Sequence, residues 1–160
     1  MASELPHFTK LPIYVSRLES GLQRRIETLK RGVGEKAHIL FLLADGDARI
    51  EGRGSETALS GPSIAWRQAA GDFRLVMEAG SAGFIAEIAE ETLVRSIGDF
   101  FESAALHALF DSDWIRSFED DRGAHDAVRR HLDSILDEVT TPQAATGMMI
   151  VAHLRIILVT

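Results

Sequence analysis

The middle of the chain, residues 36–90, alternates short apolar runs with clusters of turn-forming residues. The apolar runs HILFLLA, SIAW, FRLVM and GFIAEIA are separated by DGD, GRGS, SGP, AAGD and AGSAG. Turn clusters at such close spacing are typical of antiparallel strands that fold on themselves into a sandwich or a barrel. Residues 38–44 are apolar on both faces, which predicts a central strand that is buried from both sides.

Two further strands are predicted before this region. Residues 11–18, LPIYVSRL, and residues 22–29, LQRRIETL, are separated by the turn sequence ESG. Together with the central runs they predict an antiparallel β-barrel over residues 11–90. Residues 1–10 lack such a pattern, and we expect a flexible N-terminus there.

The apolar period changes to about 3.6 residues after the last strand, which predicts a helical segment over residues 91–160, packed on the barrel. A first short helix is expected to end near Gly98. Asp99 and Glu102 have the spacing of a capping box, and they predict that a second helix begins there. Residues 114–118 are interpreted as a further turn.

Two longer helices close the chain. The first is predicted over residues 123–139 and carries one apolar stripe. Thr141 and Pro142 have the pattern of an N-cap followed by proline at the first helical position, so the last helix is expected to begin there. Except for His153 and Arg155 this helix is apolar all round, and it must therefore be buried on more than one side.

The barrel and the preceding helix account for only part of this burial. We expect the remaining apolar surface to pair two copies of the chain in a homodimer. The predicted interface residues are Leu132, Leu136, Met148, Val151, Leu154 and Leu158.

Composition narrows the function classes. The net charge is −7, from 17 basic and 24 acidic side chains, which argues against direct binding of DNA or of an anionic membrane. The chain has no cysteine, so disulfides, thiolate metal ligands and a thiol nucleophile are excluded. The N-terminus lacks the apolar core of a signal peptide, and the longest apolar run is too short to span a bilayer. We expect a soluble, cytoplasmic protein of one domain.

Catalytic and metal motifs do not emerge from the sequence. A metal-dependent barrel of this kind needs three or four ligands, and His38 is the one histidine on the central strand, so neither a metal nor another cofactor is expected. The sequence contains no G-x-S-x-G nucleophile elbow. The acidic runs DSD and EDD lack the spacing of a calcium loop.

A ligand pocket is the remaining candidate site. We expect Arg24, His38, Trp66, Arg74 and Glu87 to face the barrel interior. A large aromatic side chain with a few charged groups is typical of a site for a small polar molecule. The competing interpretation is that Trp66 belongs to the core and that the arginines are solvated.

The run AHILFLLADGDARIEG, the run SGPSIAWRQAAGDFRLVMEAGSAGFIAEIAEETL and the helical tail from Asp121 together resemble one known family. They are similar to the central strand, the turns and late strands, and the terminal helices of the amino-terminal cupin-like domain of AraC-type transcription regulators. The resemblance extends from about residue 11 to the end of the chain.

The resemblance implies a mainly β, α+β fold: an antiparallel jelly roll followed by a helical dimerisation segment. It implies a barrel that senses an unidentified small-molecule effector, and a DNA-binding module of two helix-turn-helix units that these 160 residues do not contain. The leading hypothesis is thus a regulatory domain without catalytic activity. Two alternatives stay open: a small cupin enzyme with a reduced site, such as an isomerase or oxygenase, and a purely structural dimerisation unit whose barrel is filled by its own side chains.

Overall fold

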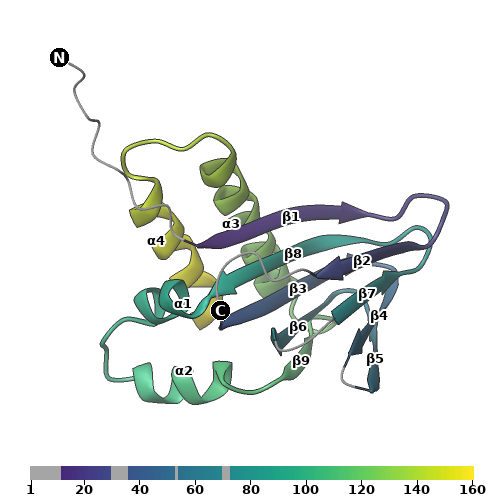
Figure 1. Cartoon of the computed structure of the whole chain (residues 1–160), viewed down its shortest axis with the longest axis horizontal. Helices are drawn as coiled ribbons and strands as arrows, with labels where there is room; N and C mark the ends of the chain where they lie inside the picture. Colours follow the sequence, from purple (N-terminus) through teal and green to yellow (C-terminus); the bar gives the residue numbers. More distant parts are fainter. Residues whose placement is uncertain (1–11, 30–35, 53, 70–72) are drawn as a thin grey trace.

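The computed structural model of the chain describes residues 12–29, 36–52, 54–69 and 73–160. Figure 1 shows the arrangement of its strands and helices. In chain order these elements are β1 Ile13–Glu19, β2 Arg25–Leu29, β3 Ala37–Asp45, β4 Asp47–Gly52, β5 Ser55–Ser60, β6 Ser63–Gln68, β7 Phe73–Met77, β8 Ala82–Ala89, α1 Glu90–Ile97, α2 Ser103–Phe110, β9 Trp114–Ser117, α3 Arg122–Thr140 and α4 Thr146–Val159. The expected flexible N-terminus, residues 1–10, lies outside the described residues.

The strands form two antiparallel sheets. One has the order β1-β8-β3-β6-β9 and the other the order β2-β7-β4-β5. Apart from the β4–β5 hairpin, each connection between consecutive strands from β1 to β8 crosses from one sheet to the other. Eight strands arranged in this way make the double-sheet jelly roll that cupins share. The predicted fold class, mainly β with C-terminal helices, is confirmed.

The central strand is β3, and it is buried on both faces as predicted. Leu40 and Leu42 belong to the apolar cluster on the helix side of the five-stranded sheet. Ile39, Phe41 and Leu43 belong to the cluster between the two sheets. Because side chains alternate along a strand, the unbroken apolar run serves two cores at once.

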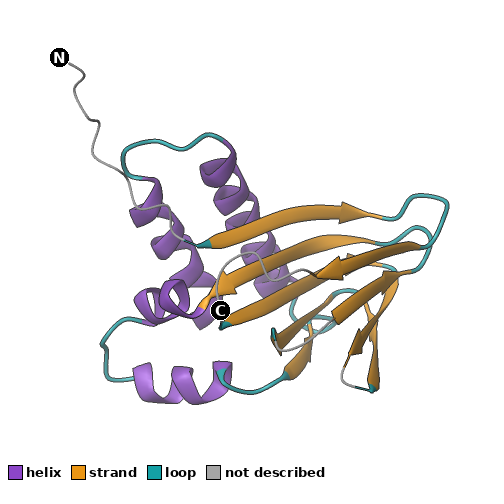
Figure 2. Ribbon diagram, in the orientation of Figure 1, coloured by secondary structure: helices purple, strands orange, loops and turns teal. Residues whose placement is uncertain are grey.

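The helices gather at one end of the strands, and the opposite end carries turns (Figure 2). Leu132 and Ile135 of α3 and Leu154 of α4 are fully buried in the helix-side cluster. The change from strands to helices falls between Ala89 and Glu90. None of the helices among the described residues is long and apolar enough to cross a lipid bilayer.

The start of the last helix differs from the prediction. The N–H of Thr141 donates to Asp137 O at 2.9 Å, so Thr141 caps the end of α3. Pro142 follows as a stop signal, because proline is common just beyond a helix C-terminus. The helix α4 begins at Thr146, whose hydroxyl accepts a hydrogen bond from the N–H of Gln143 at 2.6 Å.

Two other boundaries also differ. The capping box does not form, and α2 begins at Ser103, whose hydroxyl accepts from the N–H of Phe100 at 2.7 Å and donates to Gly98 O at 2.9 Å. Residues 114–118, interpreted as a turn, contain a strand. This strand, β9, pairs with β6 and forms one edge of the five-stranded sheet.

Candidate functional site

Three aromatic side chains gather where the five-stranded sheet meets α2. Trp66 of β6 and Trp114 of β9 are paired in the antiparallel register, and their rings stack with centroids 6.2 Å apart. The ring of Phe110, the last residue of α2, meets the Trp66 indole edge-on at 4.7 Å. Stacked and edge-on pairs of this kind add to the stabilisation from burial. The cluster therefore makes a rigid aromatic wall beside α2.

Hydrogen bonds hold the end of α2 against this wall. Trp66 Nε1 and Gln68 Nε2 both donate to Phe110 O, at 2.9 and 2.7 Å. The backbone N–H of Gln68 donates to Asp113 Oδ1 at 2.9 Å. Carbonyl groups in the last turn of a helix lack partners within the helix, so these donors satisfy the end of α2 and fix it on β6.

A cavity of about 680 Å³ lies between the outer face of the five-stranded sheet and the helices. The sheet contributes Leu40, Ile64 and Trp66 to its walls. Pockets that hold drug-sized ligands measure roughly 300–1,000 Å³ and are mostly apolar. This cavity is the candidate functional site. The helices α1, α2 and α4 line it with Ile97, Leu106, Leu109, Phe110, Ile157, Leu158 and Val159.

One cation of the cavity wall is Arg155 of α4. Its Nε–H donates to Ser96 O on α1 at 3.0 Å, and its guanidinium lies 5.1 Å from the centre of the Phe100 ring. These contacts position the group without neutralising it. Among the described residues no carboxylate lies within ion-pair distance of Arg155, and its two Nη groups donate no hydrogen bond.

Other polar groups in the wall are held differently. Arg116 Nη2 lies 3.3 Å from Asp121 Oδ2, and its Nη1 donates to Thr160 O at 3.2 Å. A carboxylate thus already neutralises Arg116. Trp114 also lines the cavity, and its buried Nε1–H finds no acceptor among the described residues. An unpaired buried donor is costly, and an acceptor atom on a ligand would satisfy it.

Two predicted pocket residues do lie together, but not inside the barrel. The rings of His38 and Trp66 are 5.4 Å apart, and both side chains are fully buried. They lie on the same face of the sheet as Leu40, which faces the helices. The expectation that Trp66 faces the barrel interior is wrong, because β6 turns this face toward α2. Trp66 lines the sheet–helix cavity instead.

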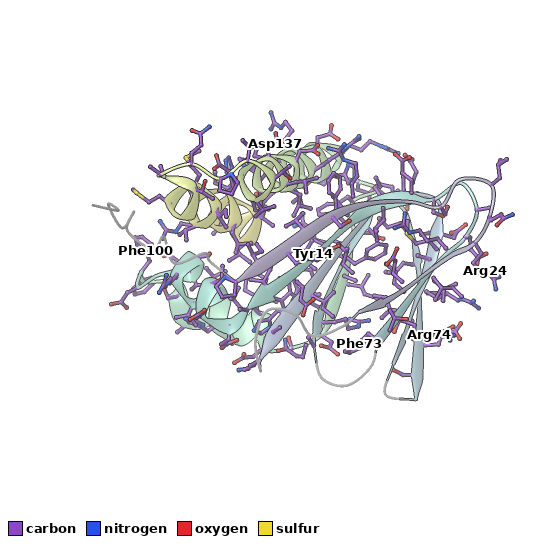
Figure 3. The ribbon with its side chains drawn as sticks, turned by 45° about the horizontal axis from the view of Figure 1, so that its top comes forward. Tyr14, Arg24, Phe73, Arg74, Phe100 and Asp137 are labelled. Atoms are coloured by element: carbon purple, nitrogen blue, oxygen red, sulfur yellow. The ribbon has the colours of Figure 1, made fainter. Side chains whose placement is uncertain are left out.

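The other three predicted pocket residues do not lie with His38 and Trp66. Glu87 is buried on the opposite face of β8, which it shares with Ile85 of the inter-sheet cluster. Arg24 and Arg74 lie at the end of the molecule away from the helices (Figure 3). Both are about half exposed and pair with carboxylates, Arg24 with Glu78 just after β7 and Arg74 with Glu51 of β4, so their expected position in the interior is wrong. The five residues do not form one site.

Among the described residues, the side chains of the inter-sheet cluster pack between the two sheets. A cavity there, lined by Ile39, Phe41 and Leu75 among others, measures about 10 Å³. Such a volume holds one water molecule at most. Around these described residues the predicted ligand pocket is therefore packed core, as expected for a barrel that is filled by its own side chains.

His38 takes part in a polar cluster that joins β3 to α1. Its Nε2 is hydrogen-bonded to the Glu90 carboxylate, and Lys36 Nζ lies 3.3 Å from the same carboxylate. Burial raises the pKa of Glu90, but the hydrogen bond and positive charge of His38, together with Lys36, outweigh it and hold that pKa below its usual value. Within the described ranges no three histidine, aspartate or glutamate side chains gather as a metal site. The absence of a metal stays a prediction.

The predicted dimer interface is only partly on the surface. Leu132, Leu154 and Leu158 are buried in the core, because they face the sheet, so their assignment to an interface is wrong. Leu136 and Val151 are half-buried, whereas the Met148 side chain is 79% exposed. The exposed face of α4 is a stripe of small and apolar side chains: Met148, Met149, Ala152, Ile156 and Val159.

Arg155 is not among the pocket residues predicted from the sequence, although the sequence contains a signal for it. Arg155 is the single arginine or lysine in residues 146–159, which are apolar apart from Thr146, His153 and Arg155. A charge inside such a helix needs a polar neighbour or a ligand. Periodicity gave no means of pairing it with Ser96 or with the aromatic wall, since these lie far away in the sequence.

The fold and cavity define a class: a jelly-roll domain whose terminal helices close an apolar pocket on the outer face of one sheet. The chain is structurally similar to the AraC-like transcriptional activator CuxR, with a TM-score of 0.54 at 10% sequence identity over 93% of this chain and 52% of that one. It is also similar to an apo form of ToxT from Vibrio cholerae, with a TM-score of 0.53 at 9% identity over 91% of this chain and 54% of that one.

These likenesses confirm the predicted resemblance to AraC-type regulators at the level of the fold. The chain spans about half the length of the solved structures that it matches. No protein-family model matches the sequence, and the search of curated proteins finds no match.

Proposed function

We propose that this chain is the effector-sensing and dimerising domain of an AraC-type transcriptional regulator. The observation that carries the proposal is the cavity of about 680 Å³ between the five-stranded sheet and the helices, in a fold similar to that of CuxR. A pre-formed apolar pocket with a few polar groups is what a small-molecule effector requires. The effector site therefore lies outside the barrel and against α1, α2 and α4.

DNA contact belongs to a separate module in this proposal. A net charge of −7 is unfavourable for binding the phosphate backbone. Regulation of transcription would place the protein in the cytoplasm. The domain would alter the regulator's oligomeric state or geometry in response to its effector, and the partner module would bind the operator.

The helix α4 is suited to carry the signal. Ile157 and Leu158 line the cavity, while Met148 and Ile156 are exposed on the opposite face. Val159 both lines the cavity and is 63% exposed. A ligand that shifts α4 would therefore change the surface offered to a second copy, and this differential contact is the requirement for allosteric coupling.

We also propose that the pocket binds without catalysing a reaction. Polar groups in its wall already have structural partners: Ser96 Oγ donates to Thr92 O at 2.7 Å, and Arg116 is paired with Asp121. Groups engaged in this way support binding and positioning more than proton transfer. The alternative, a cupin enzyme with a reduced site, would require turnover of the bound molecule.

The test is a thermal-shift screen of small metabolites on the 160-residue chain, followed by calorimetry of each hit. Leu106→Trp fills the cavity from α2 and should abolish binding of a true effector. Leu22→Trp, at a position 98% exposed in the turn before β2, is the matched control and should bind normally.

Mass spectrometry of the incubated ligand distinguishes the two functions. Recovery of the unchanged molecule supports an effector domain, and accumulation of a product would establish an enzyme. Binding that is equally strong in Leu106→Trp would remove the cavity from the proposal.

A further inference from the structure

The two arginines in the cavity wall differ in whether a carboxylate neutralises them. This difference indicates which class of effector the proposed domain binds. Arg116 is neutralised by Asp121, whereas Arg155 has no ion-pair partner among the described residues. Both Nη groups of Arg155 are without a hydrogen bond to the described residues, because its one hydrogen bond to them uses Nε. Among the described lining residues, Arg155 is therefore a positive charge without an ion-pair partner, and it lies beside apolar walls.

The Arg155 guanidinium is positioned before any ligand arrives. Its Nε–H donates to Ser96 O at 3.0 Å, and its Cζ lies over the Phe100 ring, 5.1 Å from the ring centre. Fixing the group in advance removes much of the entropy cost of binding. A planar fork of two N–H groups matches the two oxygens of a carboxylate, and such bidentate pairs are short and strong.

The other residues of the cavity wall determine which apolar groups the effector can carry. Leu40, Ile64 and Leu106 offer aliphatic surface, and Trp114 offers an aromatic face together with an unpaired Nε1–H. A volume of about 680 Å³ accommodates a medium-length acyl chain or a ring with a side chain. Burying each CH₂ group contributes to binding in proportion to its area.

The anion is limited to a single charge. Glu102, exposed at its position before α2, also lines the cavity and would repel a second negative group. A phosphate monoester carries a charge of about −1.5 to −2 at neutral pH, which exceeds the single positive charge of Arg155. A carboxylate carries one charge and presents two acceptor oxygens.

We propose that the effector is an amphipathic monocarboxylate, with its apolar body against the aromatic and aliphatic walls and its carboxylate on Arg155. The Trp114 Nε1–H is the second donor to the polar end of the ligand. This inference rests on the proposed function, since it names the chemical class of effector for the same cavity.

The first experiment compares ligands on the wild-type chain. Dodecanoate, dodecanol and dodecylamine are titrated below their micelle concentrations, with calorimetry and the fluorescence of the two tryptophans as readouts. Dodecanoate should bind with one-to-one stoichiometry and about 10- to 100-fold more tightly than dodecanol, as expected for a hydrogen-bonded charge. Dodecylamine should bind most weakly. Leu106→Trp should abolish binding of dodecanoate.

The second experiment uses variants at the cation. Arg155→Gln should weaken dodecanoate binding by about 10- to 100-fold and leave dodecanol binding unchanged. Arg155→Lys, which keeps the charge but loses the planar fork, should retain part of the affinity. Arg95→Gln removes one exposed positive charge from α1, outside the cavity, and is the matched control. Circular dichroism checks that each variant is folded.

The outcomes separate this inference from the function on which it rests. Equal affinity of wild type for dodecanoate and dodecanol, or loss of both in Arg155→Gln while the chain stays folded, overturns the monocarboxylate. A polar, uncharged metabolite that binds wild type but not Leu106→Trp also overturns it, and the effector-sensing function then stands. If no small molecule binds the cavity in either experiment, the proposed function fails together with the inference.

Discussion

The indole Nε1 of Trp66 donates a hydrogen bond to the backbone carbonyl of Phe110 at 2.9 Å. This single bond connects the sheet to the last residue of α2, 44 positions along the chain. Both residues also line the cavity. The geometry of the candidate site and the stability of the domain therefore depend on the same contact.

We predict that Trp66→Ala lowers the free energy of unfolding by about 3–5 kcal/mol, the range for removing a large buried aromatic side chain. Trp66 is fully buried, and its loss also leaves Phe110 O with one donor fewer. Trp114→Ala should cost less, since that side chain is partly exposed and its Nε1 has no partner among the described residues. Urea unfolding followed by circular dichroism measures both. Equal losses in the two variants would contradict the assignment of Trp66 as the central support.

The second prediction concerns Gly83 of β8. A Cβ atom at this position would lie 2.1 Å from Leu42 O on β3, which is backbone and cannot move aside. Gly83→Ala should therefore destabilise the sheet by about 1–3 kcal/mol or more, as overpacking does. Gly123→Ala is the matched control, because its Cβ would come no closer than 3.8 Å to Asp121 Oδ1. In the first turn of α3 alanine should stabilise by up to about 1 kcal/mol.

Thermal or urea unfolding decides between these two glycines. A Gly83→Ala variant as stable as Gly123→Ala would mean that β3 and β8 are not in the close register described here.

The sequence predicted the core strands well because their apolar patterns are unambiguous. The run that forms β3 is apolar at every position from Ile39 to Ala44, and such a run has no polar face to expose. The same apolar pattern on both faces gave no indication of which face of the sheet carries the candidate site. Alternation places His38 and Leu40 on one face, but when both faces are apolar it does not say which faces the helices. Trp66 was accordingly expected in the barrel interior, whereas it faces α2.

Local signals failed where one sequence fits two structures. Thr141 and Pro142 suit a helix start, yet here they end α3. The short run WIRS is too brief to show a period, and its strand exists because β6 offers a free edge. The ion pairs of Arg24 and Arg74 depend on Glu78, just after β7, and on Glu51 of β4. Only the strand register supplies that information.

A pH dependence is expected from the pair that joins α3 to α4. The Nδ1 atoms of His131 and His153 lie 2.8 Å apart, so one ring donates and the other accepts. Burial lowers the pKa of His131, and the charges of His153 and Arg130 lower it further, below its usual 6.5. The unfolded chain therefore binds more protons than the folded chain in this range, and stability rises with pH.

The contribution of His131 is thus fully present above about pH 6.5 and is lost as the pH falls through the lower folded pKa. We expect His131→Gln to show a shallower fall in urea midpoint between neutral and mildly acidic pH than wild type. His107→Gln, on α2 and away from this pair, should keep the wild-type slope. Identical slopes for wild type and His131→Gln would refute the prediction.

Glu90 should act at a lower pH. Despite its burial, His38 and Lys36 hold the pKa of Glu90 below its usual 4.5. A carboxylate with a lowered folded pKa contributes stability above about pH 4.5, and this contribution disappears as the pH falls through the folded value. Glu90→Gln should flatten the stability profile in that acidic range. The neighbouring Glu91→Gln, exposed on α1, should leave the profile unchanged, and a shared effect of both variants would count against the cluster with His38.

The last prediction is that two copies of the chain associate through the exposed stripe of α4. Met148 is 79% exposed and Ile156 is 41% exposed, on one face of the helix. A two-fold axis beside this face would bring the stripe of one copy against the same stripe of the other. Each side chain of the stripe would then be buried in both copies. Burial of such a side chain contributes roughly 1.5–3 kcal/mol. Met148→Glu with Ile156→Glu should therefore give a folded monomer, by light scattering and circular dichroism.

Matched substitutions on the buried face of α4 should behave in the opposite way. Leu154 and Leu158 pack against the sheet and α1 in the helix-side core, so Leu154→Glu with Leu158→Glu places two unpaired charges there. That variant should be unfolded, so its association cannot be measured. If the wild type is monomeric at high concentration, or if Met148→Glu with Ile156→Glu still dimerises, α4 is not the interface. A folded monomer from the exposed pair and an unfolded chain from the buried pair would identify which face of α4 meets the second copy.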